Sequence, residues 1–181
     1  MTTYYEFGPI PKDFHSFEKG APFQHCSLCN ADLFKEGTNY LIEKAFRKKE
    51  TIFEYAMCLD CYSGLQQSLS KKSRELIENY FEEHIDTNTR ASTLLDKHGR
   101  RSRSWLGHCM IKGTPRWKCE EHQIYGLFID KDIVFNGLPY MLSGAAIDDI
   151  LQLLSPETIG SLNDLSDKLF GIDLPQSILV L

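Results

Sequence analysis

The sequence contains no long apolar segment and no recognisable export signal. A membrane-spanning helix needs about 18 or more consecutive apolar residues, and no stretch of the chain approaches that length. No segment near Met1 combines a basic start, an apolar centre and a small-residue cleavage site, as a secretory signal does. We therefore expect a cytoplasmic protein without membrane association, whose cysteines are kept reduced.

The common catalytic motifs are also missing. The chain has no nucleophile elbow, no phosphate-binding glycine loop and no zincin helix. Its acidic pairs are adjacent in sequence, which turns the two carboxylates away from each other and is typical of solvated faces. We therefore predict that the protein is not an enzyme. An enzyme whose site is assembled from distant C-terminal residues stays open as an alternative.

Acidic residues are absent from one segment of the chain. Lys97 to Lys118 holds seven basic residues and no acidic one, although the whole chain has a net charge of −5. Cationic side chains bind phosphates, and the indoles of Trp105 and Trp117 can stack on unpaired bases. This basic strip is therefore a candidate polyanion site, with the residues Arg100, Arg101, Arg103, Lys112, Arg116 and Lys118. The competing interpretation is a solvated strip, or one paired with the acidic C-terminal region, with both tryptophans in the core.

Four of the six cysteines form two Cys-x-x-Cys pairs, Cys26/Cys29 and Cys58/Cys61, with 28 residues between the pairs. Two such pairs supply four thiolates for a tetrahedral metal site, and four protein ligands leave no coordination position for a substrate. The spacing predicts one structural Zn²⁺. Disulfides and a redox dithiol are the alternatives, and the absence of an export signal and of a thioredoxin-like βαβ pattern disfavours them.

The order of elements around these cysteines is a knuckle, a β-hairpin and the start of a helix. It resembles the treble-clef zinc finger, and the resemblance covers about residues 23–69. Some members of that family bind nucleic acid and others bind proteins, and one branch carries a nuclease histidine in the hairpin. No histidine lies between Asn30 and Met57, which argues against that nuclease activity. The predicted elements are the knuckle Cys26–Asn30, the strands Tyr40–Arg47 and Ile52–Met57, and a helix that begins at Cys58 and Cys61.

A second metal site is a weaker hypothesis. Cys119 and His122 have a permissible ligand spacing, and Cys109, next to His108, would have to complete the set. Free cysteines are commonly buried as small hydrophobic residues, which is the interpretation that we favour for Cys109 and Cys119.

Hydrophobic spacing predicts further elements. Helical periodicity covers residues 62–85, with a break near Ser70, and a second hairpin is expected over residues 124–135 with another strand at 138–142. Two C-terminal helices follow, the second beginning at Ser155-Pro156-Glu157 and ending at Gly171. Residues 1–24 and 87–123 show no clear period, and Ile178 to Leu181 is expected to dock on the core.

The sequence thus predicts an α+β protein in two regions. Residues 1–90 form a treble-clef-like zinc module with an aromatic N-terminal segment and a following helix. Residues 91–181 carry the basic strip, a hairpin and two C-terminal helices. We predict a non-catalytic, zinc-stabilised binding protein for a protein partner. The alternatives are nucleic-acid binding through residues 97–118 and an enzyme with a site in the C-terminal region.

Overall fold

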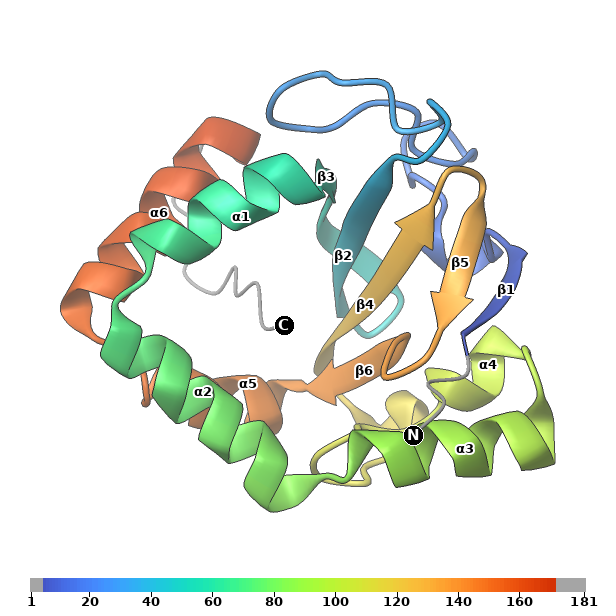
Figure 1. Cartoon of the computed structure of the whole chain (residues 1–181). Helices are drawn as coiled ribbons and strands as arrows, with labels where there is room; N and C mark the ends of the chain where they lie inside the picture. The colour runs from blue at the N-terminus through green and yellow to red at the C-terminus, as the bar shows by residue number, and fades with distance from the viewer. Residues whose placement is uncertain (1–4, 172–181) are drawn as a thin grey trace.

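A computed structural model of the chain describes residues 5–171, which fold as an α+β protein around one antiparallel sheet of six strands (Figure 1). The strand order is β1-β5-β4-β2-β3, and β6 pairs with the other end of β4. The strands are β1 Glu6–Pro9, β2 Asn39–Arg47, β3 Glu50–Cys58, β4 Glu121–Ile129, β5 Asp132–Phe135 and β6 Tyr140–Ser143. Both predicted hairpins are confirmed.

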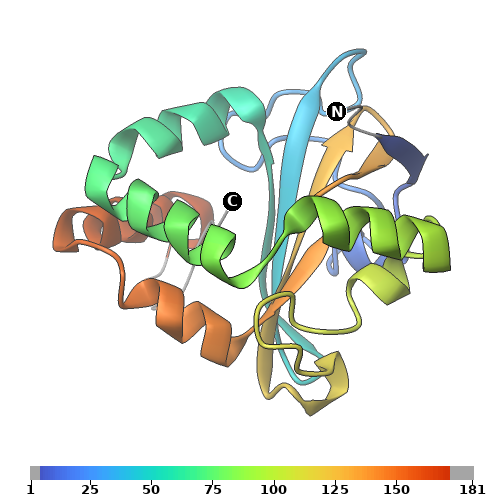
Figure 2. The ribbon, with the colours of Figure 1, turned by 60° about the horizontal axis from the view of Figure 1, so that its bottom comes forward.

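Both faces of the sheet are covered, so β2 is buried along most of its length. Helices cover one face of the sheet (Figure 2). In the pairing of β2 with β3, Glu43 lies opposite Tyr55. On the other face, Phe14 from the N-terminal segment packs edge to face on Phe128, which stacks on Tyr40. Burial on both faces explains why β2 reads as a nearly continuous apolar run interrupted by Glu43 and Lys44.

The helices are α1 Leu59–Ser68, α2 Lys71–His84, α3 Thr87–His98, α4 Ser102–Trp105, α5 Gly144–Leu151 and α6 Pro156–Phe170, with short 3₁₀ turns η1 Lys12–Phe14 and η2 Arg116–Lys118. The predicted break near Ser70 is confirmed, because its hydroxyl caps α2 by accepting from the Ser73 N–H. Ser155 caps α6 in the same way, and Gly171 ends α6 in the left-handed conformation. The predicted docking of Ile178 to Leu181 lies outside the described residues.

Two segments without a clear period in the sequence form regular elements. Residues 6–9 form β1, which pairs with β5, and residues 87–98 form α3. Helix α3 has no buried residue and only a few partly buried apolar ones, so its hydrophobic period is weak. Of the helices described, none is long and apolar enough to cross a bilayer.

The predicted division into regions 1–90 and 91–181 stays a prediction. Strands β2 and β4 pair across it through nine residue pairs, so the two regions share one sheet. Residue 90 itself lies inside α3.

Arg90 holds α3 against the sheet. Its guanidinium donates hydrogen bonds to the carbonyls of Gly137, Pro139 and Trp105 at 3.0–3.2 Å, and its Cζ lies 5.3 Å from the centre of the Trp105 ring. Burial lowers the pKa of Arg90 to about 10. One side chain therefore ties α3, α4 and the segment before β6 together.

We expect Arg90→Met to lower the free energy of unfolding by about 3 kcal/mol, because three carbonyls lose a charged donor. Urea denaturation measures this loss. The matched control is Arg101→Met, since Arg101 is exposed and its Nε donates only to the His98 carbonyl among the contacts described. Equal stability of the two variants would contradict the anchoring role of Arg90.

Candidate metal centre

The structure brings all four paired cysteines together. The Sγ atoms of Cys26, Cys29, Cys58 and Cys61 lie within 4.8 Å of one another, and Cys29 Sγ is 3.7 Å from Cys58 Sγ. A tetrahedron of sulfurs with zinc–sulfur distances of about 2.3 Å has edges of about 3.8 Å. The sulfur spacing is therefore compatible with one tetrahedral metal ion.

Local backbone structure positions each pair. Asn30 has φ of 60°, and its N–H donates to the Cys26 carbonyl at 2.9 Å, which closes the tight turn of the knuckle. Ser27 ties the knuckle to β3, because its N–H donates to the Ala56 carbonyl and its Oγ accepts from the Ala56 N–H. The knuckle is thus fixed to the strand that leads into the second cysteine pair.

The second pair lies at the start of α1. Cys58 is the N-cap residue and Cys61 is in the first turn, where the helix dipole favours thiolates. The observed order is therefore knuckle, hairpin β2–β3 and helix α1, as the spacing predicted.

The thiols differ in acidity because they are crowded. Burial raises the pKa of Cys26, but N–H donors from Cys29, Cys58 and Leu28 outweigh it and lower that pKa to about 7. The pKa values of Cys58 and Cys61 are raised, chiefly by burial and also by the neighbouring sulfurs. A cation bound at the centre would lower these pKa values, since a bound metal deprotonates its thiol ligands.

The three residues of the second hypothetical metal site have other contacts. Cys109 Sγ is buried and accepts hydrogen bonds from the N–H and hydroxyl of Ser143. Cys119 Sγ lies 3.5 Å from the Pro115 carbonyl, and His122 Nε2 accepts from Arg116. Within residues 5–171, these three ligand atoms form no cluster with metal-binding distances.

The basic strip is divided by ion pairs. Lys112 bonds Asp149 in α5, Arg116 bonds Asp13 at 2.9 Å, and Arg100 lies 3.8 Å from Glu6. Trp105 is 1% exposed and belongs to the core, whereas Trp117 is 80% exposed. The basic strip is therefore not one continuous surface of unpaired cations, because some of its candidate polyanion residues form ion pairs.

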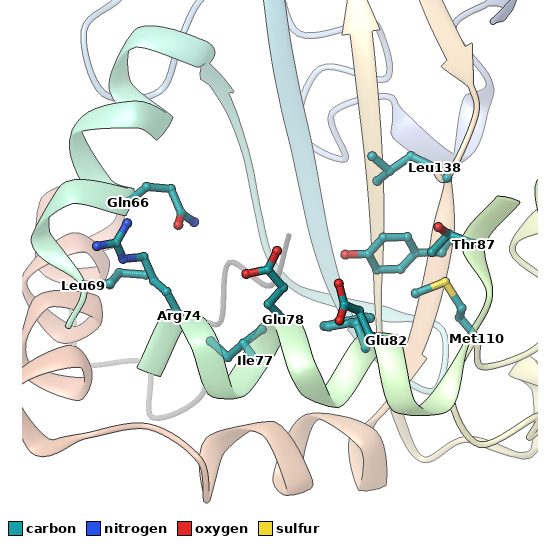
Figure 3. A pocket seen from close by; sticks show the side chains of 12 residues that line it. Gln66, Leu69, Arg74, Ile77, Glu78, Glu82, Thr87, Met110 and Leu138 are labelled. Carbon is teal, nitrogen blue, oxygen red and sulfur yellow. The ribbon is translucent and has the colours of Figure 1, made fainter. Parts of the chain in front are cut away.

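A cavity of about 570 Å³ lies between α2 and the sheet (Figure 3). Figure 3 shows Glu78 and Glu82 pointing from α2 toward the sheet. One cation, Arg74, shares the lining with these two carboxylates, and neither glutamate forms an ion pair with a described residue. The apolar part of the lining consists of Leu69, Ile77, Phe81, Met110, Leu138 and Tyr140. Sequence reasoning missed this cavity, because its lining comes from segments as far apart in the chain as Gln66 and Tyr140.

Sequence reasoning also missed a buried carboxyl group. Glu43 is 1% exposed, and the Tyr55 hydroxyl donates to its Oε2. Burial raises the pKa of Glu43 well above its ordinary value, and hydrogen bonds with Tyr55 and Tyr125 only partly oppose this rise. A charged residue in the middle of an apolar strand pattern was the available signal for this group.

The four-cysteine cluster is the strongest indication of a ligand in the described chain. Its chemistry indicates a soft metal ion in a closed shell. Comparison of this chain with protein-family models, with curated proteins and with solved structures finds no match in any of the three.

Proposed function

We propose that this protein is a non-catalytic binding protein, stabilised by one zinc ion in a treble-clef-like unit, which binds a segment of a protein partner. The observation that carries the proposal is the four-cysteine cluster at the N-terminus of α1. The C-terminal end of the same helix contributes Gln66 to the lining of the cavity beside α2. Helix α1 thus connects the four-cysteine cluster to the cavity beside α2, which we propose as the partner-binding surface.

The donor set supports zinc and a structural role. Four thiolates favour a soft or borderline ion, and zinc is commonly held by four cysteines in tetrahedral structural sites. The residues that would hold it are Cys26, Cys29, Cys58 and Cys61. Zinc would there supply a crosslink between the knuckle, the hairpin and α1, with no position left for a reacting group.

The cavity lining indicates the chemistry of the partner segment. Half of the twelve lining residues are apolar, and two carboxylates from α2 share the lining with one guanidinium, so the lining carries a net negative charge. A segment that combines one or two large apolar side chains with a lysine or arginine complements both features. Glu78 and Glu82 are the expected partners of the basic residue.

This assignment can be tested by phage display, in which peptides are selected from a library of random 12-residue sequences. Against the zinc-loaded protein, we expect enrichment of peptides with large apolar residues and lysine or arginine. The double variant Glu78→Lys/Glu82→Lys should reverse the charge preference toward acidic peptides, because the cavity then carries positive charge. Removal of zinc with a chelator should abolish selection, since α1 loses its anchor.

Glu75→Lys/Glu83→Lys is the matched control, because it reverses two exposed carboxylates of the same helix that do not line the cavity. It should retain the preference of the unchanged protein. Peptides without basic residues, or the same reversal in the control variant, would contradict the proposed partner. A chain ending at Gly171, selected in parallel, tests whether residues 172–181 fill the cavity instead.

A further inference from the structure

A second hollow lies on a different part of the molecule, between the β2–β3 turn and the loop that carries η2. The ribbon of this turn lies beside that loop in Figure 2. The N–H of Lys48 donates to the Glu120 carbonyl at 2.7 Å, which fixes the turn against that loop. The hollow has a volume of about 480 Å³, and we call it the basic groove. Its lining includes Phe46, Lys48, Lys49, Arg103, Arg116, Trp117 and His122.

The basic groove concentrates positive charge on an otherwise acidic protein. Four of its lining residues are lysine or arginine, and none of the described lining residues is acidic. Lys48 lies 3.5 Å from Glu120, in a pair in which both side chains are exposed, and such pairs contribute little. Lys49 and Arg103 form no ion pair with any residue in the range 5–171. Free cationic side chains are therefore available to an anionic ligand.

An aromatic platform borders the same groove. Trp117 is 80% exposed, although a large indole is usually buried, and the ammonium group of Lys118 lies 5.0 Å from its centre. An exposed indole beside cations provides a surface on which a nucleic-acid base can stack, at about 1–3 kcal/mol per base.

Arg116 is held in place at the inner wall of the groove. Its Nη1 bonds Asp13, its Nε donates to His122 Nε2 at 3.0 Å, and its guanidinium lies 5.3 Å from the centre of the Phe46 ring. These contacts fix the guanidinium before any ligand arrives, so little side-chain entropy is lost on binding.

His122 is a neutral, buried residue of the groove wall. It is 3% exposed and stacks on Phe46 with 5.0 Å between ring centres. Burial and the Arg116 charge lower its pKa to about 4, so the ring is neutral at pH 7. Because Nε2 accepts a hydrogen bond from Arg116, the neutral ring carries its hydrogen on Nδ1. Nδ1 is buried and has no hydrogen-bond partner among the described residues.

We propose that the basic groove binds single-stranded nucleic acid, with Lys48, Lys49 and Arg103 holding phosphates beside the fixed guanidinium of Arg116 and with Trp117 stacking on an unpaired base. Stacking on Trp117 requires a base that is free of a duplex. This site lies apart from the cavity beside α2 and does not depend on the proposed protein partner. The proposed site differs from the basic strip of residues 97–118, because it also includes two lysines from the β2–β3 turn.

Fluorescence anisotropy with labelled 12-nucleotide oligo(dT) and oligo(U) tests the proposal on the zinc-loaded full chain. If about three phosphates are neutralised, affinity should fall about 20-fold between 50 and 200 mM salt. Lys49→Ala/Arg103→Ala should weaken binding at least about tenfold at 50 mM salt and flatten the salt dependence. Trp117→Ala should weaken binding about fivefold or more at both salt concentrations, and Trp117→Phe should restore part of the loss.

Arg100→Ala/Arg101→Ala is the matched control, because it removes two charges from the basic strip but none from the groove. It should leave affinity within about twofold. Equal losses in the control and groove variants would overturn the assignment, as would the absence of salt-dependent binding. A 12-residue polyglutamate peptide that competes as well as the oligonucleotides would assign the groove to acidic peptides instead. Peptide selection at the other cavity should be unchanged in all these variants, which separates failure here from failure of the proposed function.

Discussion

Replacement of Cys58 with serine is expected to remove the proposed zinc ion and to destabilise the protein more than any other single change considered. The Cys58 sulfur lies 3.7 Å from that of Cys29 at the N-cap of α1, so its loss opens the coordination shell and releases the helix start. Structural zinc sites contribute about 10–16 kcal/mol of apparent binding free energy at neutral pH. Loss of even about 3 kcal/mol of stability would lower Tm by about 6–12 °C in a chain of this size.

Elemental analysis and thermal unfolding measure both effects. The unchanged protein should contain about one zinc per chain and Cys58→Ser much less. Cys119→Ser is the matched control, because Cys119 is only partly buried and lies outside the cluster. It should keep the zinc and the Tm. A fully folded, zinc-free Cys58→Ser protein would disprove the structural role of the metal. Loss of zinc from Cys119→Ser would instead support a second metal site that includes Cys119.

Glu43→Gln is expected to change the pH dependence of stability. Burial raises the pKa of Glu43 in the folded state well above its ordinary value of about 4.3 in the unfolded chain. The folded protein therefore binds one more proton than the unfolded chain between these two pKa values. Stability from this group is fully present below about pH 4.3 and is lost as pH rises toward the folded pKa, by up to about 1.4 kcal/mol per pH unit.

Glutamine keeps the shape of Glu43 and the acceptor for Tyr55 but does not ionise. As pH rises from 5, the free energy of unfolding of Glu43→Gln should therefore improve steadily relative to that of the unchanged protein, until the pH reaches the folded pKa of Glu43. Urea denaturation of both proteins at matched zinc concentration measures this difference, because any effect of pH on the metal site is common to both. Glu75→Gln, at an exposed carboxylate that pairs with Lys71, should show no such trend. A flat difference for Glu43→Gln would mean that Glu43 is ionised in the folded protein.

Short-range patterns in the sequence predicted the four-cysteine cluster and the elements around it. Cys26 and Cys29 are three residues apart, as are Cys58 and Cys61, so each pair needs only a turn to bring its sulfurs together. Two β-rich runs and a charged turn between them predicted the hairpin that separates the two cysteine pairs. Local capping chemistry likewise placed the starts of α2 and α6.

Segments without a strong local pattern were missed for an identifiable reason. Strand β1 is only four residues long and exists because β5 offers it an edge, which the sequence of residues 1–24 cannot reveal. Helix α3 is held by Arg90, whose three carbonyl acceptors lie 15 to 49 residues away in the chain. Tertiary contacts, rather than intrinsic propensity, stabilise both elements.

The sequence by itself determined the fold class and the four-cysteine cluster, because a hydrophobic period and a three-residue cysteine spacing are local properties of the chain. Only the tertiary structure decided which basic side chains are neutralised and which are free. Lys112 meets Asp149 across 37 residues and Arg116 meets Asp13 across 103, whereas Arg103 lines a groove with Lys49 from the β2–β3 turn. Coulomb interactions act over a few ångströms in space, so a surface charge pattern becomes defined only when folding brings distant segments together.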